Sequence, residues 1–480
     1  MSTPNPPERR HRWRPKLLAG AGLAALGVVA IAAPAVAQEA EVDPAQLVQV
    51  NLDNVFVLLC AVLVIFMQAG FALVEAGMTR AKSVANIMMK NLMDFCAGAV
   101  AFLAVGYAIA FGGDFTGSGK FFGADGFFLG DGAFAYGNLT PSVNFMFQVA
   151  FAATAATIVS GAMAERTKFK AYLIYSFIIS LVIYPIVVRW QWGGGWLYQL
   201  DTPFHDFAGS TIVHLTGGVA AFWGAKVLGP RIGKYVDGKP VAILGHSVPY
   251  AILGVFILLV GWYGFNPGSE LAADAAIGPI AVTTTAAGAM GALAAMAMVW
   301  LKEGVPDVGM TGNGLLAGLV AITAGCAAVT PQAALVIGAC AGIIVVWGIH
   351  FIERVLKVDD PVGAVAVHGI NGAFGTICVG LFARDDVDGF WSQGLFYGGG
   401  ADQLVSQLIG VLSVFAWVSL TSYLLFTVLK HTVGLRVTEE EELAGLDILE
   451  HGSPGYGEGF GSFVPPSSNG GSTPVKETVS

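Results

Sequence analysis

The chain reads Asp206-Phe-Ala-Gly-Ser-Thr-Ile-Val-His-Leu-Thr-Gly-Gly218 at one point and Asp360-Pro-Val-Gly-Ala-Val-Ala-Val-His-Gly-Ile-Asn-Gly372 at another. Both stretches follow the pattern D-x-x-G-x-x-x-x-H-x-x-x-G, and each opens an apolar segment. The aspartate of each copy suits a helix N-cap, and Pro361 suits the first helical position of the second copy. His214 and His368 lie eight residues beyond their aspartates, which is about 12 Å along a helix.

The composition around these stretches is that of a membrane protein. Hydrophobic residues make up 55% of the 480 residues and charged residues only 12%, whereas a soluble domain carries about 25% charged residues. A helix that crosses a bilayer needs about 20 mostly apolar residues. By this length criterion, the sequence predicts eleven transmembrane helices, near residues 52–76, 84–112, 141–164, 169–189, 207–229, 241–265, 278–301, 311–329, 331–354, 361–382 and 402–431.

The repeated pattern opens the fifth and the tenth of these helices. Two halves of five helices each have opposite topology, which is the inverted-repeat plan of many transporters. The two histidines therefore enter a core about 30 Å thick from opposite faces and end near its middle as neighbours. The sequence predicts an all-α membrane protein with two inverted five-helix repeats and a final helix.

The distribution of basic residues predicts the orientation. The loops after helices one, three, five, seven and nine, together with the C-terminal tail, carry most Lys and Arg residues, so this side is expected to be cytoplasmic. Residues 1–37 have a basic start, an apolar stretch and an Ala35-Val-Ala37 cleavage pattern, which predict a signal peptide. An uncleaved first helix is the alternative. The mature N-terminus is expected outside a plasma (inner) membrane, with residues 38–431 as the membrane domain.

A pair of buried histidines limits the chemistry of the site. Two neutral rings that share a hydrogen bond hold at most one proton near neutral pH, which suits a proton relay or a small solute that donates and accepts hydrogen bonds. We place no carboxylate near either histidine, which disfavours a hydrated metal ion. A haem held by both histidines is an alternative. No H-E-x-x-H, G-x-S-x-G or P-loop is present, so we expect no enzyme, cofactor, metal or nucleic-acid partner.

Several further motifs follow one another in a characteristic order. They are Gln68-Ala-Gly-Phe-Ala-Leu-Val-Glu-Ala-Gly77, Arg80-Ala-Lys82, Phe147-Gln-Val-Ala-Phe151, Gly161-Ala-Met-Ala-Glu-Arg166, Trp192-Gly-Gly-Gly195, Gly264-Phe-Asn-Pro-Gly-Ser269, Val358-Asp-Asp-Pro361 and Gly434-Leu-Arg-Val437. With the two histidine motifs, they resemble the Amt/Rh ammonium transporter family, on its Amt side, from about residue 50 to residue 451.

The resemblance implies roles for residues on the pore axis. His214 and His368 match the twin histidines of the family, and Phe151 and Phe265 match two phenylalanines stacked as a gate above them. It also implies that ammonium, or methylammonium as an analogue, is deprotonated outside and passes through a hydrophobic pore. The family assembles as homotrimers in the lipid bilayer, with one pore in each subunit.

The resemblance also implies an outer recruitment site for the cation. Trp192, Ser269 and Phe147 match that site, and Asp206 matches the aspartate that supports it without touching the ion. Without the family resemblance, these aromatic residues would be interpreted as ordinary packing between helices. Arg189 lies close to this site in the sequence, and we expect it to face lipid headgroups or a neighbouring subunit. Glu75 and Asp94 are expected to be structural partners of nearby backbone or of Lys90.

The chain ends in two segments of different character. Residues 432–452 predict an ordered cytoplasmic tail with the acidic run 439–442, for which Lys168, Lys170, Arg231, Lys234 and Arg354 are candidate partners. The family tail packs under the neighbouring subunit, beside which PII-type signalling proteins bind. Residues 453–480 are rich in Gly, Ser and Pro and are expected to be disordered and dispensable. An ammonium sensor that acts through a partner remains an alternative to a transporter.

Overall fold

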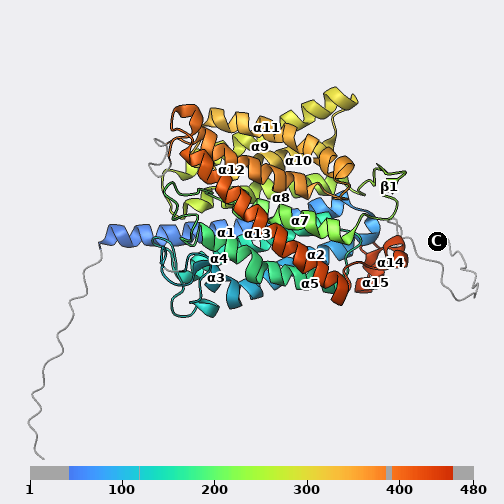
Figure 1. Cartoon of the computed structure of the whole chain (residues 1–480), viewed down its shortest axis with the longest axis horizontal. Helices are drawn as coiled ribbons and strands as arrows, with labels where there is room; N and C mark the ends of the chain where they lie inside the picture. Colours follow the sequence, from blue (N-terminus) through green and yellow to red (C-terminus); the bar gives the residue numbers. More distant parts are fainter. Residues whose placement is uncertain (1–42, 118, 385–391, 458–480) are drawn as a thin grey trace, which may run out of the picture. The chain divides into compact units, whose positions relative to one another are not determined.

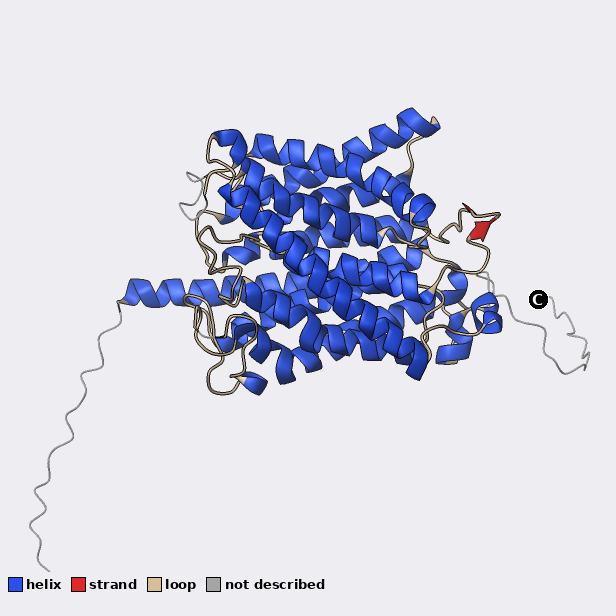
Figure 2. Cartoon of the chain, in the orientation of Figure 1, coloured by secondary structure: helices blue, strands red, loops and turns tan. Residues whose placement is uncertain are grey.

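A computed structural model describes residues 43–117, 119–384 and 392–457. The expected signal peptide, residues 1–37, lies outside the described residues, as does most of the segment 453–480. Figure 2 shows that the fold is helical, with one short hairpin of β1 (Tyr235–Val236) and β2 (Lys239–Pro240).

The described residues contain ten helices that are long and apolar enough to cross a membrane, together with one shorter apolar helix. The spans are α1 (Pro44–Met78), Ala81–Phe111, α4 (Pro141–Met163), Phe169–Trp190, Ser210–Leu228, Val248–Glu270, α9 (Ile277–Glu303), α10 (Val308–Thr323), Pro331–Val355, Val365–Phe382 and α13 (Asp402–Thr432). The predicted all-α membrane fold is confirmed, and the short span α10 is the one that falls below the length of the others.

Several spans consist of more than one helical piece. These pieces are η1 (Ala81–Ser83), α2 (Val84–Ala101), η2 (Phe102–Gly106) and α3 (Tyr107–Phe111); α5 (Phe169–Ile178), η4 (Ile179–Ile183) and α6 (Tyr184–Trp190); η5 (Ser210–Leu215) and α7 (Thr216–Leu228); α8 (Val248–Phe265) and η6 (Pro267–Glu270); α11 (Pro331–His350) and η7 (Phe351–Val355); η8 (Val365–Ile370) and α12 (Asn371–Phe382). Outside the spans lie η3 (Phe127–Leu129), η9 (Leu395–Tyr397), α14 (Glu439–Ala444) and α15 (Leu446–His451). Figure 1 shows the spans running side by side, with α14 and α15 at one end of the bundle.

Local sequence fixes where several spans begin. Thr140 and Thr330 each accept a hydrogen bond from the backbone three residues later, and a proline follows each at the first helical position. Asp307 caps α10 in the same way, at 2.6 Å from the nitrogen of Met310. Such caps satisfy N–H groups that have no partner within the helix. The cap residues and the prolines therefore mark these helix starts in the sequence.

Glycine lets the short span α10 approach α9 closely. A Cβ atom at Gly318 would lie 2.2 Å from the carbonyl oxygen of Ala287, and one at Gly314 would lie 2.4 Å from the Cβ of Ala295. The pair forms a Gly-x-x-x-Gly motif, which is typical of helices that pack tightly in lipid.

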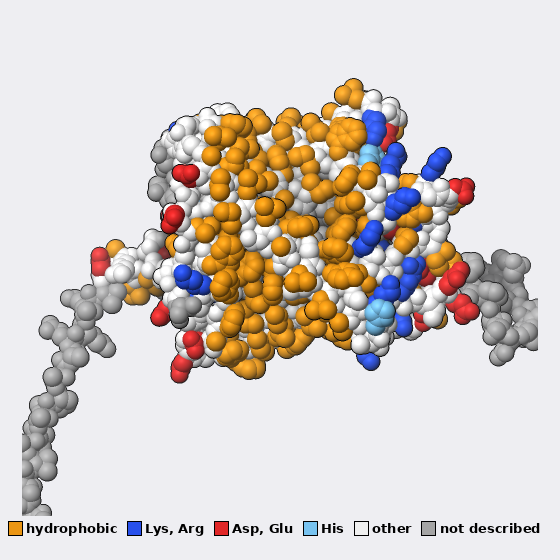
Figure 3. Space-filling view, viewed as in Figure 1, with side chains coloured by type: hydrophobic (Ala, Val, Ile, Leu, Met, Phe, Trp, Pro, Cys, Tyr) orange, Lys and Arg blue, Asp and Glu red, His pale blue; other side chains and the backbone are white. Residues whose placement is uncertain are grey.

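The surface separates into an apolar belt and a basic rim. Figure 3 shows hydrophobic side chains covering the middle of the bundle, while most Lys and Arg side chains gather at one end of the helices. This end, which we call the basic rim, includes residues whose loops contact one another, namely Arg80, Lys82, Arg166, Arg231, Lys234, Arg354 and Arg436. The chain is therefore a multi-pass membrane protein with an asymmetric charge distribution.

The C-terminal tail is docked on the basic rim. Lys82 donates to the carbonyl oxygens of Glu442 and Leu443, and Asp447 accepts a hydrogen bond from the backbone nitrogen of Asn86 at 2.9 Å. The contacts continue past residue 452, because the Tyr456 hydroxyl lies 2.6 Å from Nε2 of His246. The ordered tail is thus longer than expected.

The partners expected for the acidic run were wrong. Glu442 pairs with Arg436, six residues earlier, at 2.7 Å and accepts a hydrogen bond from the nitrogen of Ile232. The side chain of Glu441 accepts a hydrogen bond from the nitrogen of Thr438 and completes a capping box. Glu441 and Glu442 therefore have partners close by in the tail, while Asp447 and Glu450 accept hydrogen bonds from the backbone nitrogens of Asn86 and Phe169 in the bundle. Two of the expected cations are engaged elsewhere, Arg231 with Glu165 and Asp359, and Lys234 with Glu353.

A buried ion-pair cluster ties three loops of the basic rim together. Arg231 lies 2.6 Å from Glu165 and 2.9 Å from Asp359. The carboxylate of Asp359 also accepts a hydrogen bond from the backbone nitrogen of Arg231. Burial raises the pKa of both carboxyl groups, but their arginine partners reverse this, so each pKa lies below its ordinary value. Arg80 adds to the effect on Glu165.

We predict that Asp359→Asn lowers the free energy of unfolding at pH 7 by about 3–5 kcal/mol, because it leaves the buried Arg231 partly uncompensated. Both carboxyl groups have a lower pKa when folded, so their contribution is complete above the unfolded pKa of about 4 and is lost as pH falls toward the folded pKa. Thermal unfolding in detergent from pH 7 downward should show the gap between variant and wild type narrowing below about pH 4.

The matched control is Glu353→Gln, which breaks the more exposed pair of Glu353 with Lys234. Its effect should stay within about 1 kcal/mol. A gap for Asp359→Asn that widens as the pH falls would contradict this account of the cluster.

Candidate conduction site

Each histidine helix begins at an aspartate, and the first of them, Asp206, is buried. The carboxylate of Asp206 accepts four backbone hydrogen bonds of 2.7–2.9 Å, from the nitrogens of Gly209, Ser210, Thr211 and Ile212. Gly209 has a φ of 114°, a left-handed conformation that favours glycine. The Asp-x-x-Gly part of the motif thus encodes a turn in which the first backbone N–H groups of the helix all donate to one carboxylate.

The second copy repeats this arrangement at the other end of the bundle. Asp360 accepts hydrogen bonds from the nitrogens of Val362, Gly363 and Val365, and Gly363 has a φ of 79°. The helices begin at residues 210 and 365 rather than 207 and 361, so Pro361 precedes the helix and does not occupy its first position. The turn at the glycine accounts for the later start.

The two histidines meet in the interior. Nδ1 of His214 lies 3.2 Å from Nδ1 of His368, and the ring centroids are 5.1 Å apart at an interplanar angle of 25°. Both lie in π-helical turns, η5 and η8, and both are buried. Glycines let their helices cross, since a Cβ at Gly218 would lie 2.2 Å from the nitrogen of Gly369. The predicted proximity is confirmed.

Aromatic rings stack on one side of this pair. Phe265 lies 5.3 Å from the ring of His214, and Phe151 lies 4.2 Å from Phe265. The sequence reasoning missed Trp262, which stacks on His214 at 5.3 Å and donates its indole N–H to Thr323. Its position three residues before Phe265 on the same helix face was the available signal.

A vestibule of about 350 Å³, which we name the outer vestibule after the side that the sequence predicts for it, borders Phe147 and Trp192, the ring neighbours of Phe151. Phe147, Trp192, Asp206 and Ser269 all line it, as do the polar side chains Gln148, Gln191 and His205, which the sequence reasoning did not single out. Trp192 is held in place because its indole nitrogen donates to the carbonyl oxygen of Asp206 at 2.8 Å.

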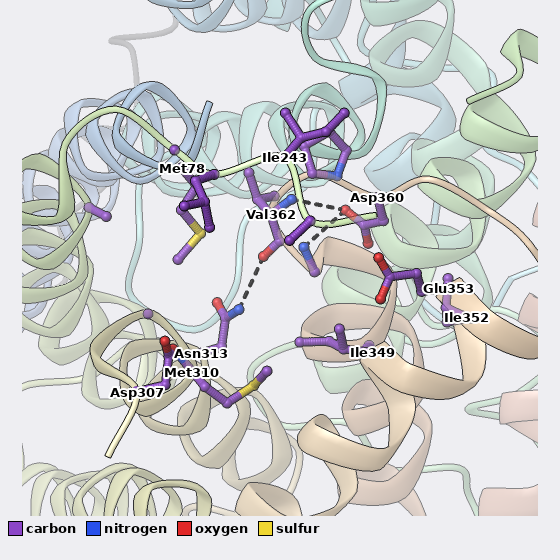
Figure 4. Close-up of a pocket in the computed structure, with 18 of the residues that line it drawn as sticks. Met78, Ile243, Asp307, Met310, Asn313, Ile349, Ile352, Glu353, Asp360 and Val362 are labelled. Atoms are coloured by element: carbon purple, nitrogen blue, oxygen red, sulfur yellow. Dashed lines mark hydrogen bonds between the residues drawn. The ribbon is translucent and has the colours of Figure 1, made fainter. Parts of the chain in front are cut away.

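A second vestibule of about 410 Å³ opens at the basic rim. Its wall includes Asp307, Glu353 and Asp360, and Figure 4 shows Asn313 donating a hydrogen bond to the carbonyl oxygen of Val362 beside it. Asp206 lines one vestibule and Asp360 the other, so the two motif copies begin at opposite ends of the bundle. This is what inverted repeats require.

The expectation for Arg189 was wrong. Its side chain is buried and donates hydrogen bonds to the carbonyl oxygens of Gly112, Gly119 and Asp114 at 2.7–3.2 Å. A glycine-rich outer loop therefore satisfies the guanidinium, which faces neither lipid nor the lining of the outer vestibule.

Two intramembrane carboxyl groups lie in a polar network among the helices. Glu75 accepts hydrogen bonds from Ser160 at 2.7 Å and Asn91 at 3.2 Å, and Asp94 accepts one from Tyr172. Lys90 donates to a backbone carbonyl instead of to either acid. Glu75 also lines a small cavity with His368, so the expectation that no carboxylate lies near the histidines was wrong.

The fold and this geometry define a polytopic membrane protein with two vestibules separated by an aromatic stack and a buried histidine pair. The profile of the Ammonium Transporter Family matches residues 55–456, and the chain belongs to this family. It is 47% identical over 423 residues to ammonium transporter Amt2 of Archaeoglobus fulgidus, covering 85% of this chain and 89% of that protein. It is 44% identical over 414 residues to a putative ammonium transporter of Synechocystis, covering 84% and 88%.

Solved structures show the same fold. A structure titled "Sensor Amt Protein" matches with a TM-score of 0.79 at 39% identity, covering 85% of this chain and 100% of that chain. The crystal structure of Candida albicans Mep2 matches with a TM-score of 0.75 at 29% identity, covering 82% and 87%.

We predict that Asp206→Ala lowers both stability and uptake, because four buried N–H groups lose a charged acceptor, and such hydrogen bonds contribute about 1.5–3 kcal/mol each. Thermal unfolding and methylammonium uptake by reconstituted protein measure the two effects. Asp274→Ala, which removes an exposed cap on the nitrogen of Ala276, is the control and should change stability by about 0.5 kcal/mol or less. Wild-type stability of the Asp206 variant would show that the carboxylate does not hold the helix start.

Proposed function

We propose that this protein transports ammonium across the membrane through the path that joins the two vestibules. The observation that carries the proposal is the buried Nδ1–Nδ1 contact of His214 and His368 beneath an aromatic stack. Ionisable side chains at such depth are costly and mark pathways for solutes or protons. The family membership supports the substrate.

The outer vestibule supplies what a small cation needs. Trp192 and Phe147 offer ring faces, and each cation–π contact contributes about 0.5–2 kcal/mol. The Ser269 hydroxyl donates its hydrogen to the carbonyl of Phe265 at 2.8 Å, which leaves its oxygen lone pairs to accept from ammonium. Asp206 acts by holding the helix start, because its carboxylate is engaged with backbone N–H groups.

The phenylalanine pair favours the neutral species. Phe151 and Phe265 are fully buried and stack at 4.2 Å, so a solute that passes between them leaves its water behind. Desolvation of a charge is far more costly than desolvation of ammonia. We therefore propose that ammonium loses a proton in the outer vestibule, and that ammonia passes the Phe gate to the twin histidines.

A haem held by the same histidines does not fit this geometry. Their nitrogens are in hydrogen-bond contact at 3.2 Å and their rings are stacked, so no macrocycle has room between them.

We predict that replacement of both His214 and His368 by Ala abolishes specific methylammonium uptake by proteoliposomes and leaves folding intact. The pair is the polar strip of the proposed path, and without it the solute crosses an apolar barrier without hydrogen-bond partners. The control is His350→Ala, on α11 outside the site, which should keep wild-type uptake. Wild-type uptake by a folded double variant would contradict this mechanism. Uptake that has lost its selectivity for ammonium would show that the histidine pair selects the solute but is not needed to conduct it.

We propose that the basic rim is cytoplasmic and the outer vestibule periplasmic or extracellular, and that the protein is a homotrimer, as the family resemblance implies. We predict that reporters fused after residue 165, 235 or 355 read cytoplasmic and that those after 125 or 390 read external, since Lys and Arg concentrate on the first side. A single reversed fusion would contradict the inverted repeat.

An ammonium sensor is the second candidate, because one matching structure has a title that calls that protein a sensor. Both functions need the same outer site. Flux distinguishes them: saturable ammonium binding by folded protein that gives no uptake in proteoliposomes would favour the sensor.

We propose that the docked tail regulates transport beside a PII-type partner at the basic rim. We predict that truncation after Lys430 lowers uptake but keeps the fold, because the tail braces the loop at Lys82 and the start of α2 through hydrogen bonds. Since Tyr456 is docked, we place the harmless truncation after Gly457 rather than after Ser453. Full uptake and unchanged sensitivity to PII protein after truncation at Lys430 would show that the tail is only a solvated end.

A further inference from the structure

Glu75 is a buried carboxyl group that the proposed transport path leaves unused. It lies on α1, its side chain is inaccessible to solvent apart from 2% of its surface, and it accepts hydrogen bonds from Ser160 and Asn91. A glutamine would accept the same two hydrogen bonds through its side-chain oxygen without an ionisable group. A carboxyl group inside a membrane is costly and is a functional hypothesis by default, so these contacts do not explain its presence.

Glu75 and one member of the histidine pair, His368, line the same small cavity. Its volume is about 20 Å³, and its lining includes Glu75, His368, Phe71, Thr157 and Val367. Such a space holds one water molecule, which needs at least about 10–15 Å³. Its wall is mostly apolar, and the polar side chains in the lining are those of Glu75, His368, Thr157 and Asn313. A water there takes at least about two of these groups as partners.

The same cavity adjoins the vestibule of the basic rim. Asn313 and Val362 line both spaces, and the hydrogen bond between them at 3.2 Å lies at this boundary (Figure 4). A proton on Glu75 therefore has a short way out that does not lead back through the histidines.

The histidine pair has the connectivity that a proton path needs. Its Nδ1 atoms face each other, so each ring keeps Nε2 for a further partner, and Nε2 of His214 has no hydrogen-bond partner among the described residues. A proton that binds at Nε2 of His214 displaces the shared proton between the Nδ1 atoms, and Nε2 of His368 then releases a proton.

We propose that Glu75 is the proton acceptor on the inner side of the histidine pair, so that the proton taken from ammonium crosses separately from ammonia. This rests on the proposed transport function. The proton leaves Nε2 of His368 for the cavity water, and that water passes a proton to a carboxylate oxygen of Glu75. The carboxylic acid then loses it to the vestibule at the basic rim, where ammonia and the proton form ammonium again. One ammonium ion disappears outside and one appears inside, so one charge moves with each ammonia.

The test uses full-length protein in proteoliposomes that contain a pH-sensitive dye, with the current and the internal pH both recorded after an ammonium pulse. Wild type should give a current and little internal alkalinisation. Glu75→Gln should keep ammonia entry, now seen as alkalinisation, while its current falls about 100-fold, the lower range for a positioned proton-transfer group. Glu75→Asp, which keeps a carboxyl group, should restore part of the current.

Two matched variants separate proton transfer from packing. Asp94→Asn removes another buried carboxylate that does not line the cavity, and Ser160→Ala removes a hydrogen bond to Glu75 and keeps its carboxyl group. Both should retain the wild-type ratio of current to alkalinisation. The inference is overturned if Glu75→Gln keeps that ratio, if Asp94→Asn changes it equally, or if wild type alkalinises the lumen without current. Wild type with neither signal would instead overturn the proposed function.

Discussion

The contact between Nδ1 of His214 and Nδ1 of His368 is the interaction on which the rest of this structure depends. Two side chains from helices of opposite direction meet to within hydrogen-bond distance only if both helices begin at fixed depths. Asp206 and Asp360 set those depths by collecting the first backbone N–H groups of each helix. Glycine at the crossing point, Gly218 against Gly369, then lets the backbones approach.

The charged groups of the chain divide into those that hold structure and those that remain available. Arg189 is satisfied by loop carbonyls, and Arg231 is satisfied by Glu165 and Asp359. Glu75 differs because it borders both a polar network and the cavity beside His368. An ionisable group buried in a membrane is costly. The position of Glu75 at this cavity therefore indicates a functional role for its carboxyl group.

The sequence predicted the parts of the site that depend on spacing along one helix. The eight-residue offset from aspartate to histidine and the eleven apolar segments are local features. It failed where distant segments supply the partner. The carbonyls around Arg189 come from a loop about 70 residues away, and Glu75 and His368, which are far apart in the sequence, line one cavity. Trp262 was missed because an aromatic residue in an apolar helix usually indicates packing.

The most direct test of the histidine pair is solid-state nitrogen NMR of histidine-labelled protein in bilayers at neutral pH, with His214 and His368 assigned by single substitutions. The account predicts two neutral rings whose Nδ1 atoms share one proton, seen as a through-bond coupling between those two nitrogens. Independent Nδ1 signals without coupling, or two positively charged rings, would contradict it.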